Sequence, residues 1–136
     1  MTTSIRPFLI GALAATAVPA MALEPDPIAG RGVYETLCAS CHGDEARGDG
    51  PLAALLTVMP ADLTQLTAQN DGVFPVIQVI RQIDGRDPML AHGGVMPIFG
   101  QMFDFPDAAI ASEAGQPIIT AQPIADVTAW LETVQE

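Results

Sequence analysis

The chain has 136 residues, of which 49% are apolar and 15% are charged, and its 5 basic against 16 acidic residues give a formal net charge of -11. Every basic residue is an arginine and none is a lysine, so the surface would repel a polyphosphate and we exclude a nucleic-acid-binding protein. The high apolar content excludes a disordered chain, and the length favours one compact domain.

Residues 1–22 differ in composition from the rest of the chain. Arg6 is their only charge and precedes an apolar run from Phe8 to Val18, which leads into the small-x-small pattern of Pro19-Ala20-Met21-Ala22. This arrangement is typical of a secretory signal peptide that is cleaved at its end. The alternative is an uncleaved membrane anchor, but the run is shorter than the ~20 residues that a spanning helix needs. We therefore expect an exported, periplasmic domain of residues 23–136 without stable membrane insertion.

A helix is predicted to begin at Asp26. The carboxylate of Asp26 can cap the first turn, and Pro27 suits that turn because a missing N–H costs nothing there. Gly30, Tyr34 and Cys38 follow at steps of four residues, which places them on one face of the helix. Taken alone, this pattern is typical of an ordinary amphipathic helix.

The two cysteines lie three residues apart in Cys38-Ala39-Ser40-Cys41, and His42 follows directly. Cys-x-x-Cys-His is the attachment signal for c-type haem. On a helical turn, the two thiols can add to the two vinyl groups at one haem edge, and a neutral imidazole nitrogen is a good iron ligand. We therefore predict one haem c, bound covalently through Cys38 and Cys41, with His42 as an iron ligand.

Other uses of the two cysteines fit the sequence less well. A thioredoxin-like Cys-x-x-Cys needs a preceding strand and a βαβ pattern, and neither is predicted near residue 38. A structural zinc site needs four ligands, and only His92 remains as a further strong donor.

With these features, the chain resembles the class I (monohaem) cytochromes c of the bacterial exported type, from about Asp26 to Val134. The resemblance implies a small fold of short helices wrapped around one haem. It also implies that the face formed by Gly30 and Tyr34 lets the last helix cross closely over the first one, with Trp130 packed on that face.

The resemblance assigns a hydrogen-bond partner to His42. A turn follows the haem motif in Gly48-Asp49-Gly50-Pro51. In this family a proline carbonyl at the place of Pro51 accepts a hydrogen bond from the proximal histidine, which orients the ring and raises its basicity. The resemblance therefore implies that Pro51 holds His42 in place.

A second helix is predicted from Pro75 to Ile83. Apolar side chains recur there at mainly helical spacing, and Gly85 is a suitable residue to end the helix. This helix would form one wall of the haem pocket.

The second axial position of the iron has five candidate residues. They are Met59, Met89, His92, Met96 and Met102. Met96 is favoured because Met96-Pro97 stands in a glycine-bordered loop, residues 93–100, which resembles the distal-ligand loop of the family. Glycines allow close backbone approach to the porphyrin, and Pro97 stiffens the segment. His92 is the main rival, since imidazole also binds iron well, an open site is a further alternative, and the remaining methionines are expected to fill apolar gaps.

Two more helices are predicted before the chain ends. One covers residues 107–114, and the other covers residues 121–134, with Thr120 as its cap and Pro123 in its first turn. Since no alternating strand pattern is found, the predicted fold class is all-α. The segment from Gln101 to Thr120 is a long spacer that either covers the haem or forms a docking surface.

Together these features predict a one-electron carrier that is not an enzyme, with His42 and Met96 as axial ligands. Thioether ligation in apolar surroundings favours a fairly high reduction potential. Two alternatives are a haem subunit of a larger dehydrogenase or oxidase complex, and a haem sensor or peroxidase-like enzyme with a displaceable sixth ligand. The chain lacks the lysines that mitochondrial-type members place around the haem edge, and its acidity predicts a redox partner with a basic docking face.

Overall fold

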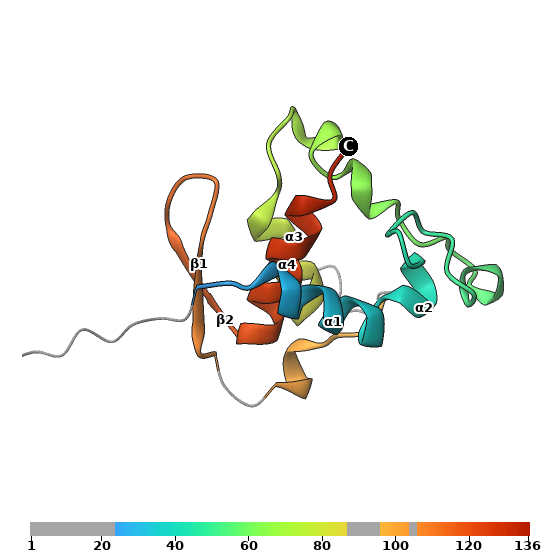
Figure 1. Cartoon of the computed structure of the whole chain (residues 1–136), viewed down its shortest axis with the longest axis horizontal. Coiled ribbons are helices and arrows are strands. Elements are labelled where there is room, and N and C mark those ends of the chain that lie inside the picture. Colours follow the sequence, from blue (N-terminus) through green and yellow to red (C-terminus); the bar gives the residue numbers. More distant parts are fainter. Residues whose placement is uncertain (1–23, 87–95, 104–105) are drawn as a thin grey trace, which may run out of the picture.

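The computed structural model describes residues 24–86, 96–103 and 106–136 (Figure 1). These residues form the helices α1 (Pro27–Leu37), α2 (Ala39–His42), α3 (Val76–Asp84) and α4 (Gln122–Thr133), and the strands β1 (Ala108–Ala111) and β2 (Pro117–Thr120). Short 3-10 turns lie between them: η1 (Ala53–Leu55), η2 (Leu63–Gln65), η3 (Ala68–Asn70) and η5 (Gly100–Met102). Within the described ranges, none of the helices has both the length and the hydrophobicity that crossing a membrane requires.

The start of α1 is confirmed as predicted. A carboxylate oxygen of Asp26 accepts the backbone N–H of Ile28 at 2.8 Å, and Pro27 occupies the first turn. The backbone N–H of Asp26 in turn donates to the side chain of Asp126 at 2.8 Å. Asp126 is buried in α4, so this hydrogen bond joins the beginning of α1 to the last helix.

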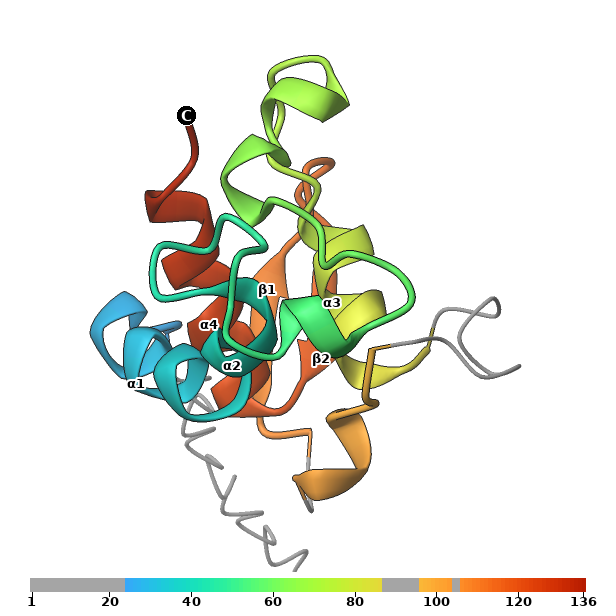
Figure 2. The same ribbon diagram turned by 90° about the vertical axis from the view of Figure 1, so that its right-hand side faces the viewer.

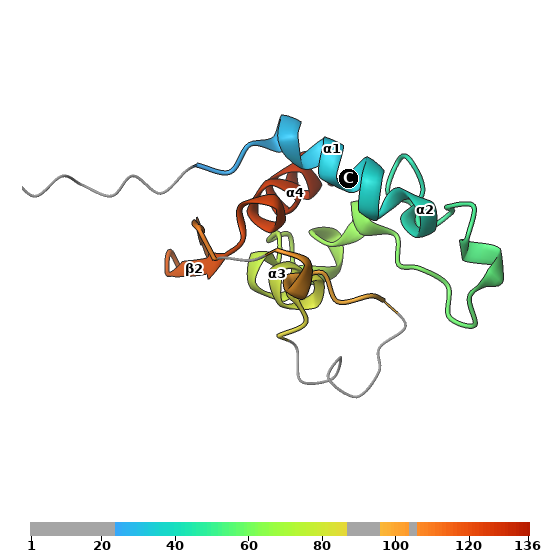
Figure 3. The same cartoon turned by 90° about the horizontal axis from the view of Figure 1, so that it is seen from below.

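Helix α4 lies between α1 and α3, and it crosses α1 closely (Figure 3). A Cβ atom built on Gly30 would lie 2.0 Å from the carbonyl oxygen of Asp126, so only a glycine permits this approach. One turn further along, the rings of Tyr34 and Trp130 pack together with their centroids 4.3 Å apart. The predicted crossing of the last helix over the face of Gly30 and Tyr34 is therefore confirmed.

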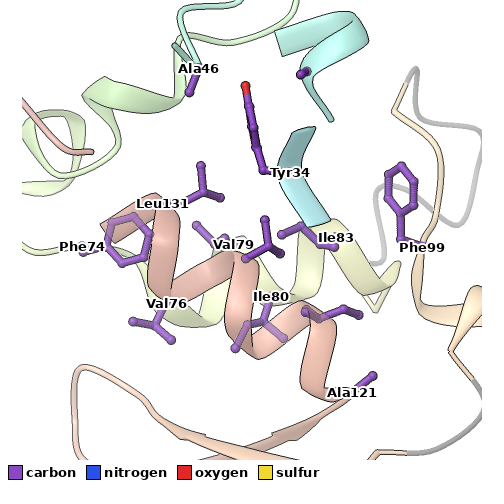
Figure 4. Packing of buried hydrophobic residues seen from close by; sticks show 13 residues of the cluster. Tyr34, Ala46, Phe74, Val76, Val79, Ile80, Ile83, Phe99, Ala121 and Leu131 are labelled. Carbon is purple, nitrogen blue, oxygen red and sulfur yellow. The ribbon is translucent and has the colours of Figure 1, made fainter. Parts of the chain in front are cut away.

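The predicted helix near residues 75–83 is also confirmed, as α3. It ends at Gly85, whose φ of 82° is the left-handed conformation that favours glycine. Apolar side chains of α3 meet those of α4 and α1 in the hydrophobic core shown in Figure 4. The largest fully buried apolar side chains of this core are Tyr34, Ile80, Ile124 and Val127.

The helix predicted over residues 107–114 is wrong, because this segment forms the first half of an antiparallel hairpin. Strand β1 pairs with β2 in a register that sets Ala108 opposite Thr120 and Ala111 opposite Pro117. Gly115 has a φ of 74° and belongs to the connecting turn, in which its N–H donates to the Ser112 carbonyl at 2.8 Å. The fold is therefore helical with a small hairpin, and the strict all-α class is not confirmed.

The beginning of α4 also differs from the prediction. Ala121 is the residue that precedes the helix, and the hydroxyl of Thr120 is buried without a hydrogen-bond partner among the described residues. Asp107, the residue before β1, caps the helix in place of Thr120, because its carboxylate accepts the N–H of Gln122 at 2.8 Å. Pro123 stands in the first turn, as predicted.

Candidate functional site

The Cys38–His42 motif forms a single helical turn directly after α1. Cys38 precedes α2, and its carbonyl accepts the N–H groups of Cys41 at 3.1 Å and His42 at 2.9 Å. Burial, together with the neighbouring Cys41, raises the pKa of the Cys38 thiol to about 11. No disulfide joins Cys38 and Cys41, and both lie on the same turn as His42, as haem attachment requires.

The loop after the motif closes back onto α2. The end of a helix leaves backbone carbonyls without partners, and three amides of the loop donate to them: Gly48 to His42 at 2.8 Å, Gly50 to Cys41 at 3.1 Å, and Leu52 to Ser40 at 2.9 Å. A Cβ atom on Gly50 would lie 2.6 Å from the carbonyl oxygen of Ala39. Glycine at this position therefore permits the close contact that fixes the motif.

Tyr34 of α1 fixes the same turn by a hydrogen bond from its buried side chain. Tyr34 is fully buried, and its hydroxyl donates to the carbonyl oxygen of Gly43 at 2.6 Å. Burial is the main cause that raises the pKa of Tyr34 well above its usual value, so the hydroxyl keeps its proton and remains a donor. Because Tyr34 also packs on Trp130, the residue after the motif is anchored to the crossing of α1 and α4.

The ring of His42 is oriented by a carbonyl that the sequence did not indicate. Its Nδ1 lies 3.1 Å from the carbonyl oxygen of Ala61, which can only accept, so Nδ1 carries the proton and Nε2 is left with a free lone pair. The resemblance gave this role to Pro51, but the described hydrogen bonds give it to Ala61. Pro51 follows Gly50, where the chain is bound to the back of α2, and Ala61 returns to His42 only at the end of the loop.

The electrostatic surroundings of His42 favour the neutral imidazole. Burial lowers the pKa of His42 below its ordinary value of 6.5, while the hydrogen bond to Ala61 acts in the opposite direction. A neutral imidazole is the form that binds iron, and a carbonyl on its other nitrogen is the usual way to fix the ring. His42 is therefore in the protonation state that ligation needs.

Met96 is brought to the motif by the C-terminal end of α3. The N–H of Phe99 donates to the carbonyl of Ile83 at 2.9 Å, and Gly100 comes so close to Asp84 that a Cβ atom would lie 2.3 Å from its carbonyl oxygen. These contacts fix the segment that begins with Met96. The Met96 side chain is half-buried, packs against the hydrophobic core and faces the side of α3 that carries Gln82.

His42 and Met96 line one cavity of about 220 Å³. Its wall comes from the four helices, the loop before α3 and the segment that begins with Met96. The lining residues are Tyr34, Cys38, His42, Leu63, Leu66, Pro75, Gln78, Val79, Gln82, Ile83, Met96, Val127 and Leu131. Figure 2 shows the ribbon of the four helices, with α1, α2 and α4 to the left of α3. A larger cavity of about 610 Å³ beside β1 contains none of the motif residues.

The donor set of this cavity fits a c-type haem. It combines an imidazole nitrogen, a thioether sulfur and a cysteine at the edge of an apolar enclosure, which is the combination found in His/Met haem proteins. Among the described residues of the wall, no carboxylate or arginine is present. The residues that would hold the group are therefore Cys38 and Cys41 by thioether bonds, and His42 and Met96 as iron ligands.

The other candidate ligands do not reach this cavity or cannot be placed. Met59 and Met102 do not line this cavity. They are 67% and 59% exposed, so they do not fill apolar gaps, and that expectation is wrong. Met89 and His92 lie outside the described residues, as does the expected signal peptide of residues 1–22. Their assignments stay predictions.

The comparisons with known proteins point to one family. The family model described as Cytochrome c matches residues 28–135, a range that runs from α1 to the end of α4 and contains both the Cys38–His42 motif and Met96. Among the curated proteins and among the solved structures, none matches this chain.

Proposed function

The chain belongs to the cytochrome c family, and from this premise we propose that it is an exported one-electron carrier with a haem c attached to Cys38 and Cys41. Membership of the family supports a haem-binding electron carrier, and the spacing of the two cysteines is consistent with covalent attachment. The observation that carries the finer proposal is the placement of His42 and Met96 on one apolar cavity with Cys38 at its edge.

In this proposal His42 and Met96 are the iron ligands, and the apolar side chains of the cavity surround the haem. When bound, the haem supplies a one-electron Fe(III)/Fe(II) couple. His42 would offer Nε2 because Nδ1 is engaged by Ala61, and Met96 would offer its sulfur from the segment that follows α3. Both ligands are neutral, and the apolar wall excludes water. These surroundings favour the less charged ferrous form, which supports a fairly high reduction potential.

The composition of the cavity favours a carrier over a haem enzyme. A peroxidase-like site needs an acid or base close to the open side of the iron. In the described part of the wall, the polar side chains besides His42 and Tyr34 are Gln78 and Gln82, which do not exchange protons at neutral pH. The hydroxyl of Tyr34 is already engaged with Gly43.

Carbon monoxide binding tests this function directly. A carrier whose sulfur ligand stays bound should not take up carbon monoxide in the ferrous state, and its redox titration should follow a single one-electron curve. Stoichiometric and rapid carbon monoxide binding by the native ferrous protein would instead support the sensor or enzyme alternative.

We also propose that the redox partner presents a basic docking face. Exposed acidic side chains follow the haem motif directly, at Asp44, Glu45 and Asp49. The one arginine of this loop, Arg47, is paired with Glu45 and with Glu136. The surface beside the motif is therefore acidic, and an acidic surface at the electron-exit edge attracts a basic partner.

A further inference from the structure

We propose that Gln82 is a positioning residue for Met96, and that its side-chain N–H donates to the Met96 sulfur and holds this sulfur on the iron. This inference rests on the function proposed above. It concerns a residue that neither the motif nor the family resemblance singled out.

The geometry that carries the proposal is a direct contact across the cavity. Nε2 of Gln82 lies 3.8 Å from Sδ of Met96, although the two residues are fourteen positions apart in the chain. Both side chains are half-buried and both line the cavity that contains His42. Gln82 lies in the last turn of α3, so its position is set by a helix whose apolar side is part of the core.

The surroundings of Gln82 explain why this contact matters. A primary amide that faces an apolar cavity loses part of its hydration, and an acceptor on the cavity wall compensates for that loss. Among the described residues, the sulfur of Met96 is the one acceptor within hydrogen-bond distance of Nε2. A thioether sulfur is a weak acceptor, but it carries two lone pairs, so one can bind iron while the other accepts the N–H.

The expected consequence concerns both the strength of the ligand bond and the potential. An N–H directed at the sulfur restricts its orientation, which keeps the lone pair aimed at the iron. It also withdraws electron density from the sulfur, which favours the ferrous state. Removing the amide should therefore loosen Met96 and lower the reduction potential.

The helix provides a matched control for this effect. Gln78 stands one turn before Gln82 on α3 and lines the same cavity, but no hydrogen bond joins it to Met96 among the described contacts. Gln82→Leu and Gln78→Leu both replace an amide by an apolar side chain of similar size. An increase in cavity hydrophobicity alone favours the ferrous state and would raise the potential in both variants.

The experiment compares the native holoprotein with these two variants. Imidazole, which competes with Met96 for the ferric iron, should bind Gln82→Leu about fivefold more tightly than the native protein, the factor expected for one lost hydrogen bond. The midpoint potential of Gln82→Leu should fall, whereas Gln78→Leu should keep native imidazole affinity and should not fall in potential. Equal behaviour of the two variants would overturn the proposal.

A second measurement keeps the proposal testable if Gln82→Leu does not fold. In the native ferrous protein, nuclear Overhauser effects should connect the side-chain NH2 protons of Gln82 with the methyl protons of Met96, and their absence would overturn the contact. Failure of the proposed function is distinguishable, because the native protein itself would then lack the near-infrared band of sulfur-to-iron ligation. With that band present and the two variants alike, only the role of Gln82 fails.

Discussion

The carbonyl of Ala61 decides which nitrogen of His42 is available to a metal. Because a carbonyl only accepts, Nδ1 keeps the proton and Nε2 keeps its lone pair. Burial lowers the pKa of the same ring, so both effects prepare a neutral ligand. The hydrogen bond involves only the backbone of residue 61, so it does not depend on which side chain stands there.

The pH dependence of the ferric holoprotein follows from the state of His42. A group whose pKa is lowered in the folded chain holds its proton less tightly than in the unfolded chain, so the folded form loses stability only as the pH falls below 6.5 towards the lowered value. Iron competes with the proton for Nε2, so ligation lowers further the pH at which His42 takes up a proton. We expect the low-spin visible spectrum to persist as the pH is lowered through 6.5, and a transition to high-spin iron centred near 6.5 would contradict the assignment.

Met96 is expected to be the second axial ligand. Met96→Ala should abolish the weak near-infrared charge-transfer band of the ferric protein and lower the potential, because the neutral sulfur that stabilises ferrous iron is removed. Met102→Ala is a matched control, since Met102 is an exposed methionine six residues later. Persistence of the band in Met96→Ala, or its loss in His92→Ala alone, would contradict this ligation.

Some residues of the candidate site can be identified from the sequence, and others only from the folded structure. Cys38, Cys41 and His42 are readable because their side chains carry the chemistry and their spacing is characteristic. The partner of His42 is a backbone carbonyl, which every residue has, so no side-chain pattern distinguishes Ala61 from Pro51. Gln82 was not recognised either, because its significance arises only when α3 and the Met96 segment come together.

At the scale of the elements, the crossing of α1 and α4 fixes the motif in space. Gly30 permits the approach, and Tyr34 connects the crossing to the carbonyl of Gly43, directly after His42. This crossing was predictable, because Gly30 and Tyr34 stand at helical spacing and the family resemblance names their role. It places the haem motif directly after α1, which together with α4 forms the most extensively packed helix pair of the described residues.

The crossing predicts opposite effects for two glycines of the same helix. Gly30→Ala places a Cβ atom 2.0 Å from the Asp126 carbonyl oxygen, and should lower the free energy of unfolding by about 3 kcal/mol. Gly32→Ala meets no atom within 4 Å, and should raise it by about 0.5–1 kcal/mol through helix propensity. Urea denaturation of the two holoprotein variants measures both values, and a neutral Gly30→Ala would refute the close crossing.

The hairpin shows why one predicted element was wrong. Ala-rich residues 108–111 have no strong strand preference, so a glycine at 115 reads equally well as the end of a helix or as part of a turn. The informative feature was the β-branched run Ile118-Ile119-Thr120, which favours a strand. The strand conformation of residues 108–111 depends on their pairing with residues 117–120. The spacing of apolar residues within one short segment does not show that this pairing forms.

Over the whole molecule, the surface near the haem motif offers two modes of docking, one electrostatic and one apolar. Exposed acidic residues follow the haem motif at Asp44, Glu45 and Asp49, but an apolar stretch comes soon after them, with Leu55, Val58 and Met59 more than half exposed. Electrostatic attraction speeds encounter and is screened by salt, whereas apolar contact is not. The dependence of the electron-transfer rate on ionic strength therefore distinguishes the two.

We expect the bimolecular rate with the physiological partner to fall as ionic strength rises. Screening shortens the range of attraction to about 10 Å at 0.1 M salt, which weakens steering by Asp44, Glu45 and Asp49. Stopped-flow reduction over a salt series measures the effect. A flat or rising rate would contradict acidic steering, and would favour docking through the apolar stretch or permanent association in a complex.

The central claim is that one haem is attached covalently to Cys38 and Cys41 of an exported chain, and the intact mass of the purified, denatured protein tests it most directly. The account predicts the mass of residues 23–136 plus one haem, with no haem released by acid-acetone extraction and impaired maturation of Cys38→Ala. A polypeptide mass without haem, or haem that extracts freely from the denatured chain, would contradict it.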